Sequence, residues 1–295
     1  MPVGKRIKRI GIIANIRKAT ALECSADLRK WLLEQGMEVF LDKEIAAAIG
    51  EKEGLDRRDL AEQSDLLVVL GGDGAMLRAA RSVREFEIPI VGINLGTFGY
   101  LTEINLNEMY PSLERILRGD YSTEDRMMLD LQVLRDGRTS CEFTVLNDVV
   151  ISRGNLSRII DMETAVDDHY LTTFRADGLI ISTPTGSTAY SLSAGGPIVF
   201  PSQNVIIVNP ICPHTLTNRP IILPCNMTVT VKVWSEEEGV NVDLDGQESV
   251  SLKSGDTLIV RRSRYVTTLV SSSNRDYLEI LRSKLGWGSL PAVKR

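Results

Sequence analysis

Apolar and polar positions follow two different patterns in the two halves of the chain. In the first third, apolar runs at 66–70 and 90–93 alternate with stretches where apolar residues recur every three to four positions, as at Leu28, Trp31 and Leu32. Short apolar runs bounded by glycine or polar residues are typical of buried strands, and the longer period is that of a helix. This alternation predicts a parallel sheet with helices on its faces, where ligands bind beyond the carboxyl ends of the strands.

From about Met127 the pattern changes to a period of two residues. The segments 229–233 and 240–244 alternate strictly between apolar and polar side chains, which predicts half-buried strands. Turn dipeptides such as Asp245-Gly246 separate these runs and favour hairpins. Further strand-like runs occur at 129–134, 143–151, 258–260 and 266–270.

The predicted fold is therefore an α/β N-terminal domain, with a parallel sheet and flanking helices, plus a mainly β C-terminal domain. We assign residues 1–122 to the first domain and 123–274 to the second. The segment 275–295 holds a final helix at 276–284, which we expect to pack back on the first domain. The other expected elements are strands at 10–14, 39–41, 66–70 and 90–93 and helices that end at Gly36 and near Gly119.

Composition narrows the class of protein. The chain has 295 residues, 25% of them charged, and a net charge of −5, which argues against a nucleic-acid binder with a broad basic face. No stretch approaches the roughly 18 apolar residues of a membrane span. The four cysteines and two histidines are scattered, without the paired spacing of a zinc site. We expect a cytoplasmic protein with no metal fixed by its own side chains.

The segment that carries chemistry is Gly71-Gly72-Asp73-Gly74, which follows the run at 66–70 and opens into a helix-like stretch. Glycines permit positive φ and bring backbone N–H groups close to a phosphate, and a helix N-terminus adds its dipole. Neither G-x-G-x-x-G nor G-x-x-x-x-G-K-[ST] is present. Asp73 suits such a turn if it accepts a proton from a hydroxyl or touches a magnesium ion; a structural turn acid is the remaining alternative. Arg78, one helical turn further on, is a further candidate for the phosphates.

A second segment, 177–197, breaks the strand pattern. It combines a strand, a Pro/Gly turn and a helix start, with five serine or threonine residues, one tyrosine and three glycines between Thr185 and Gly196. Such a surface suits a sugar or a nucleobase, whereas the simpler interpretation is a helix capped by its hydroxyls, with amides pointing outward. A polar loop at 214–220 follows between apolar strands.

Together these segments closely resemble the NAD kinase family. The match consists of Gly71-Gly72-Asp73-Gly74, Asn147-Asp148, the run from Asp177 to Pro197, and His214-Thr215-Leu216 with Arg219-Pro220. The first motif is shared with lipid kinases and phosphofructokinases, whereas the long run is highly specific. Family members usually have Asn-Glu where Asn147-Asp148 stands, so the acid here reaches about 1.5 Å less far.

The resemblance implies transfer of the γ-phosphoryl group of ATP to the 2′-hydroxyl of the adenosine ribose of NAD, giving NADP. It also implies NAD bound between the two domains, Mg²⁺ or Mn²⁺ as a cofactor carried with ATP, and a homodimer or homotetramer. Asp73 would be the general base or orienter of the hydroxyl, with magnesium ligation as its alternative role. Asn147 would contact the N6/N7 edge of adenine, and Asp148 would accept a hydrogen bond from a ribose hydroxyl; the alternative is a polar pair at a strand bulge.

The remaining candidates are assigned by the same resemblance. Asp177 would fix the nicotinamide end or its ribose. Arg158 and Arg175 would be cationic contacts, with ordinary surface arginines as the alternative. Asp245 and Gln247 flank a tight turn and either reach the ligand or belong to a plain hairpin. Residues expected to line the dinucleotide are Thr185, Thr188, Ala189, Tyr190, Ser191, Leu192 and Ser193. Two other functions stay open: a lipid kinase, which would need an apolar cleft, and a non-catalytic dinucleotide sensor, against which the intact Asp73 argues.

Overall fold

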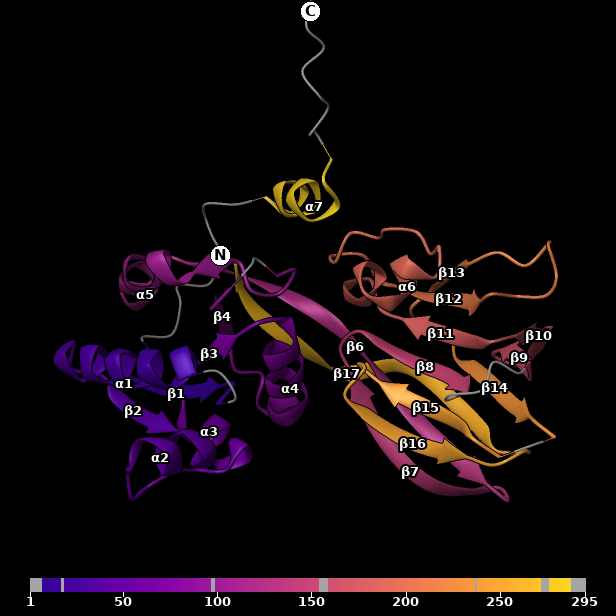
Figure 1. Cartoon of the computed structure of the whole chain (residues 1–295), viewed down its shortest axis with the longest axis horizontal. Coiled ribbons are helices and arrows are strands. Elements are labelled where there is room, and N and C mark those ends of the chain that lie inside the picture. Colours follow the sequence, from indigo (N-terminus) through magenta and orange to yellow (C-terminus); the bar gives the residue numbers. More distant parts are fainter. Residues whose placement is uncertain are drawn as a thin grey trace, which may run out of the picture. The chain divides into compact units, whose positions relative to one another are not determined.

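The computed structural model describes residues 7–16, 19–96, 99–153, 159–236, 238–271 and 276–287 (Figure 1). The described residues within Met1–Glu124 and Thr268–Arg295 form one compact unit, and those within Asp125–Thr267 form another. The domain limits expected from the sequence stay predictions. No helix in the described part of the chain is long and apolar enough to span a bilayer.

The first unit contains a parallel sheet in the order β2-β1-β3-β4, which confirms the predicted α/β fold. Beyond β4 lie the short β5 and the last residues of β17, both parallel to it. The strands are β1 (Arg9–Ala14), β2 (Glu38–Leu41), β3 (Leu66–Gly71), β4 (Ile90–Asn94), β5 (Ile104–Asn105) and β17 (Thr257–Ser271). The helices are α1 (Ala19–Glu34), α2 (Lys43–Ile49), α3 (Arg57–Gln63), α4 (Asp73–Val83), α5 (Met109–Leu117) and α7 (Tyr277–Leu285), with short 3₁₀ turns at Arg84–Phe86 and Leu106–Glu108.

Helices cover both faces of this sheet. Ile10 and Ile12 of β1 share one apolar cluster with Leu28 of α1. On the opposite face a Cβ added to Gly11 would lie 3.0 Å from Cγ of Leu60, so the glycine lets α3 pack closely. Figure 1 shows α1 on one side of β1 and β2 and α3 on the other. Because α4 follows β3 at its carboxyl end, the Gly71–Gly74 turn lies at the edge of the sheet where the sequence predicts ligands.

The second unit consists of two antiparallel sheets. One has the order β10-β9-β14-β17 with β6 and β7 beside β17, and the other has the order β13-β12-β11-β8-β15-β16. The strands are β6 (Ser122–Arg135), β7 (Arg138–Val145), β8 (Asp148–Arg153), β9 (Ile160–Val166), β10 (His169–Ala176), β11 (Gly178–Ser182), β12 (Val205–Ile211), β13 (Ile221–Pro224), β14 (Val229–Trp234), β15 (Val240–Leu244) and β16 (Glu248–Leu252). The short helical turns η3 (Thr185–Thr188) and α6 (Tyr190–Ser193) follow β11.

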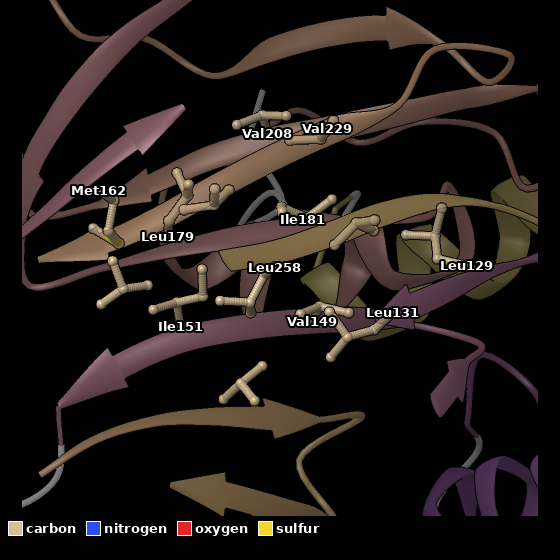
Figure 2. Close-up of a cluster of buried hydrophobic side chains, with 14 of the residues drawn as sticks. Leu129, Leu131, Val149, Ile151, Met162, Leu179, Ile181, Val208, Val229 and Leu258 are labelled. Carbon is tan, nitrogen blue, oxygen red and sulfur yellow. The ribbon is translucent and has the colours of Figure 1, made fainter. Parts of the chain in front are cut away.

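Apolar side chains from both sheets form a single buried cluster (Figure 2). Burial alternates along β14 and β15, which confirms the half-buried strands predicted at 229–233 and 240–244. Two sheets that interdigitate in this way form a sandwich, whose core comes from the inward-facing residues of each strand. The cluster includes Leu129, Leu131, Met162, Val229 and Leu258 from the first sheet and Val149, Ile151, Leu179, Ile181 and Val208 from the second.

Two strand predictions in this unit are wrong in extent. The run 143–151 is divided into β7 and β8, because the backbone at Asn147 leaves the ladder: its N–H donates to Oδ1 of Asp245 at 2.7 Å. The runs 258–260 and 266–270 belong to one strand, β17, since the charged residues between them occupy exposed positions of a continuous strand.

Candidate functional site

In the turn Gly71-Gly72-Asp73-Gly74, a single residue, Gly72, separates the strand from the helix. β3 ends at Gly71 and α4 begins at Asp73, with Gly72 as its N-cap. None of the three glycines has positive φ, so the conformational freedom that glycine permits is not used here: the chain passes directly from extended to helical backbone. Gly71 is instead required by packing, since a Cβ there would lie 2.7 Å from Cβ of Ala75. The N-terminal dipole of α4 is thereby placed at the turn, where it favours a phosphate.

The Asp73 carboxylate accepts three hydrogen bonds from the segment that follows β4. Oδ2 accepts from the N–H of Tyr100 at 2.8 Å, and Oδ1 accepts from the N–H of Leu101 at 3.0 Å and from Oγ1 of Thr102 at 3.2 Å. Gly99 completes the contact, because a Cβ there would overlap Asp73. An ionised carboxylate has about four acceptor positions. The carboxylate is thus held in one orientation with one position at Oδ2 left for a further donor.

The residues at this turn do not form a metal cage. Among the described residues no group of three or more His, Cys, Asp or Glu side chains could hold a metal ion. The donors on Asp73 leave it room for at most one further contact. A single available carboxylate position fits a divalent cation that is bound mainly by substrate phosphates and has few protein ligands, as magnesium does in phosphoryl-transfer sites.

In the second unit, six of the predicted ligands line one cavity of about 590 Å³. They come from three separate segments: the turn between β7 and β8, the start of α6, and the hairpin between β15 and β16. The six are Asn147, Asp148, Ala189, Tyr190, Asp245 and Gln247, and their neighbours in the wall include Val150, Asp243 and Glu248. A concave site of this size suits a small-molecule ligand.

Asp245 anchors the turn that carries Asn147. Asp245 and Gly246 have φ of 52° and 62°, and the N–H of Gln247 donates to the carbonyl of Leu244, which is the tight hairpin that the sequence predicts. The Asp245 carboxylate accepts from three successive N–H groups, those of residues 146, 147 and 148, at 3.2, 2.7 and 3.2 Å. This position fixes the backbone of Asn147, whose side chain lines the cavity.

Asp148 is surrounded by other acids. It is 3% exposed. Burial, together with the negative charges of Asp245 and Asp243, raises the pKa of the Asp148 carboxyl from an ordinary 3.8 to about 7. Near neutral pH a large fraction of Asp148 therefore carries a proton and can donate a hydrogen bond as well as accept one.

The hydroxyls of the segment after β11 are used differently from the prediction. The N-caps of η3 and α6 are Pro184 and Ala189, and neither makes a side-chain cap; the hydroxyl of Thr183, the residue before Pro184, accepts from the N–H of Gly186 in the first turn of η3 at 3.1 Å. Ser187 instead donates to the carbonyl of Pro184 at 2.7 Å, which shows that its hydroxyl closes the turn internally. Ser191 is fully buried, and Nδ2 of Asn209 donates to its carbonyl at 2.9 Å.

The other predicted ligands in this segment differ in accessibility. Oγ1 of Thr185 is buried without a hydrogen-bond partner among the described residues, which leaves it for a water or a ligand. Tyr190 is 47% exposed, so its ring and hydroxyl face solvent at the cavity wall. Ser193 is exposed, and Thr188 and Leu192 are half-buried.

Two predicted residues of the second unit belong to a different cavity. Arg175 and Asp177 line a second cavity of about 640 Å³, together with His214 and Arg153. Arg78 is half-buried in the second turn of α4. Arg158 lies outside the described residues. The sequence analysis missed Tyr100, Leu101 and Thr102, which follow the glycine-containing loop after β4 but carry no motif of their own; it also missed Asp243.

The chain combines an α/β unit that has a glycine-rich turn and one fixed carboxylate with a β unit that has a polar small-molecule cavity, and this combination is typical of a kinase that acts on a nucleotide. Comparison with known proteins makes this specific. Residues 10–121 match the ATP-NAD kinase N-terminal domain and residues 146–272 match the ATP-NAD kinase C-terminal domain. The NAD kinase of Geotalea daltonii is 49% identical over 282 residues, covering 96% of this chain and 99% of that protein. The NAD kinase of Geobacter sulfurreducens is 50% identical with the same coverage.

Solved structures agree with these sequence matches. The yeast NADH kinase, crystallised with NADH, has a TM-score of 0.90 at 27% identity, covering 99% of this chain and 91% of that one. An NAD kinase from Archaeoglobus fulgidus in complex with ATP shares the fold, with a TM-score of 0.76 at 23% identity over 94% of this chain and 98% of that one. The chain therefore belongs to the NAD kinase family, which is metal-dependent in general, and its reaction is the phosphorylation of NAD to NADP.

Proposed function

We propose that the γ-phosphoryl group of ATP is transferred to the 2′-hydroxyl of the adenosine ribose of NAD, and that Asp73 orients this hydroxyl and accepts its proton. The observation that carries the proposal is the fixed Asp73 carboxylate, with three donors in place and one acceptor position at Oδ2 left over. Phosphoryl transfer depends mainly on positioning and on stabilising charge, so a weak base in a fixed position is sufficient.

The dinucleotide is bound by the cavity of the second unit. The side-chain amide of Asn147 can offer its oxygen and its NH₂ group together to the N6/N7 edge of adenine. Asp148 contacts a ribose hydroxyl, and Tyr190 supplies an aromatic face. Relatives crystallised with NADH and with ATP support these two small molecules as partners. The other proposed contacts of the substrates are Asp177, Thr185, Thr188, Ala189, Ser191, Leu192, Ser193, Arg158, Arg175 and Gln247.

We further propose Mg²⁺ or Mn²⁺ as the cation, held by the ATP phosphates and touching at most Asp73. When bound, such a cation neutralises charge on the β- and γ-oxygens. The chain itself contributes the N-terminus of α4 and the guanidinium of Arg78, both of which favour anions in the same region.

The oligomeric state of the protein and its cellular compartment are also proposals. We propose a cytoplasmic homodimer or homotetramer. The four cysteines, Cys24, Cys141, Cys212 and Cys225, are all free thiols, which agrees with a reducing compartment. Light scattering of the purified protein measures the assembly, and a monomer at working concentration would contradict it.

The experiment that tests the reaction is an ATP-dependent assay in which the product is detected by a dehydrogenase specific for the 2′-phosphate of NADP. We expect NADP with ATP, NAD and Mg²⁺, and no ADP release when diacylglycerol replaces NAD as acceptor. NADH as acceptor and polyphosphate as donor define the substrate range in parallel. Excess chelator should abolish turnover. Full turnover in chelator, or phosphorylation of the lipid, would contradict the proposal.

A further inference from the structure

Two buried polar side chains, Asn94 and Thr102, form a row of hydrogen bonds that ends at the Asp73 carboxylate. Asn94 is the last residue of β4 and the register partner of Gly71, and it is 4% exposed; Thr102 is 0% exposed. Nδ2 of Asn94 donates to Oγ1 of Thr102 at 2.9 Å, and Oγ1 of Thr102 lies 3.2 Å from Oδ1 of Asp73. Burying polar groups costs free energy unless they are hydrogen-bonded. Removing one of these three side chains would therefore leave a buried polar atom of its neighbour without that hydrogen bond.

A backbone amide determines which group donates and which accepts in the hydrogen bonds between Asn94, Thr102 and Asp73. The N–H of Gly96 donates to Oδ1 of Asn94 at 2.8 Å. Since a backbone N–H only donates, this contact identifies the oxygen end of the Asn94 side chain and leaves the NH₂ end facing Thr102. The Thr102 hydroxyl must therefore accept from Asn94, and its single proton is directed to Asp73.

We propose that Thr102, supported by Asn94, is a positioning residue for NAD phosphorylation, which holds Oδ1 of Asp73 so that Oδ2 meets the ribose hydroxyl. Thr102 is the side-chain member of the three donors, whereas Tyr100 and Leu101 contribute backbone amides. Rotation of the carboxylate about its Cβ–Cγ bond would break all three hydrogen bonds. The inference rests on the proposed role of Asp73 in the reaction.

The first test compares Thr102→Val with Thr102→Ser. Valine keeps the shape of the side chain and removes the donor, and it leaves Nδ2 of Asn94 without its acceptor. Because the two amides still hold the carboxylate, we expect a fall in kcat of about tenfold, with KM for NAD changed by less than about threefold. Serine restores the hydroxyl and should bring kcat back to within about threefold of the parent.

A matched control separates this effect from a general loss of packing. Thr164 is also 0% exposed, and its hydroxyl donates to a backbone carbonyl, that of Met162, at 3.1 Å. Thr164→Val should lower thermal stability and leave kcat within about twofold of the parent. If Thr164→Val and Thr102→Val reduce kcat equally, the inference is overturned.

The second test is a double-mutant cycle with Asp73→Asn. If Thr102 acts through Asp73, Thr102→Val should cost about tenfold in the parent and less than about twofold in the Asp73→Asn background. An equal loss in both backgrounds overturns the inference, as does Thr102→Val activity within about twofold of the parent. These results leave the role of Asp73 intact. If Asp73→Asn itself retains kcat within about tenfold of the parent, the role of Asp73 fails and the inference fails with it.

Discussion

Two aspartates, one in each unit, stand at the ends of strands in opposite surroundings. Asp73, after β3, accepts hydrogen bonds from two backbone amides and the hydroxyl of Thr102. Asp148, at the start of β8, is 3% exposed, and burial with the charges of Asp245 and Asp243 raises its pKa to about 7. Asp73 therefore faces hydrogen-bond donors, whereas Asp148 faces other carboxylates.

This difference indicates a division of roles between the units. A carboxylate surrounded by donors keeps one orientation and can receive a proton from a hydroxyl. A carboxyl that titrates near neutral pH can donate to a ligand or accept from it, and Asp148 lines the cavity of the second unit, which is our reason for assigning it to binding. We therefore propose that the same residue type serves the reaction in one unit and recognition in the other, and the predictions below test that division.

The largest effect is expected for Asp73→Asn. The substitution preserves the shape of the side chain and removes the proton acceptor, so kcat should fall by about 10²–10⁴, the usual contribution of acid–base catalysis. KM for NAD should change little, since the carboxylate acts on the reacting hydroxyl. Steady-state kinetics with NAD varied at saturating ATP measures both constants; a kcat within about tenfold of the parent would show that Asp73 is only a turn residue.

The next effect concerns Asp148→Ala. Near pH 8, above its pKa of about 7, Asp148 is mostly ionised, and loss of a hydrogen bond to a charged group costs about 1.5–3 kcal/mol, so kcat/KM for NAD should fall by about 10- to 150-fold at that pH. The same kinetic experiment decides it. If Asp148→Ala behaves like the parent, this residue is not a substrate ligand, and the division of roles between the two aspartates is wrong.

The raised pKa of Asp148 also predicts a pH-dependent stability. Between about pH 4 and 7 the folded protein keeps a proton on Asp148 that the unfolded chain has lost, so the free energy of unfolding falls as pH rises through this window. Asp148→Asn removes the ionisable group, and with it this loss of stability at higher pH. In urea unfolding the variant should be more stable than the parent by on the order of 2 kcal/mol near pH 8, and the difference should vanish near pH 4.

Asp65 is a control, because its pKa is shifted in the opposite direction from that of Asp148. Burial alone would raise its pKa, but the Arg9 side chain and the amides of Lys8 and Arg9 outweigh burial and lower the pKa to about 2. Its contribution to stability is present above about pH 4 and is lost as pH falls toward 2. Asp65→Asn should therefore destabilise the protein near neutral pH and lose this effect in acid. The same pH trend for both variants would contradict the assignment of Asp148.

The smallest effect is expected for Asp148→Glu, which restores the residue usual in the family. One added methylene group should be accommodated by a small shift or by displacing a bridging water, so kcat/KM should change by less than about tenfold. A larger loss would show that the surroundings of Asp148 are built for the shorter side chain.

Much of the fold could be predicted from local pattern. The apolar run before Gly71 and the helical spacing after it predict β3, the turn and α4, and strict alternation predicts β14 and β15. These elements are determined mainly by their own residues. Helices α2 and α3 were not predicted, although Asp42 and Asp56 cap them, because a seven-residue helix has too few turns for its period to stand out.

The details of the two aspartate sites depend on distant residues. The break at Asn147 arises because Asp245, 98 positions further on, accepts the hydrogen bond of its N–H. The pKa of Asp148 likewise depends on Asp243 and Asp245 from the β15–β16 hairpin. The donors to Asp73 include backbone amides, which leave no trace in residue type. Sequence could indicate which residues matter, but their charge and orientation required the fold.

The central claim is that Asp73 acts in the reaction and Asp148 in binding. Calorimetric titration of NAD into Asp73→Asn and Asp148→Ala, without ATP, separates the two roles most directly because no chemistry occurs. The account predicts that Asp73→Asn binds NAD with a Kd within about threefold of the parent, while Asp148→Ala binds it at least about tenfold more weakly. Equal weakening in the two variants, or a greater loss in Asp73→Asn, would contradict it.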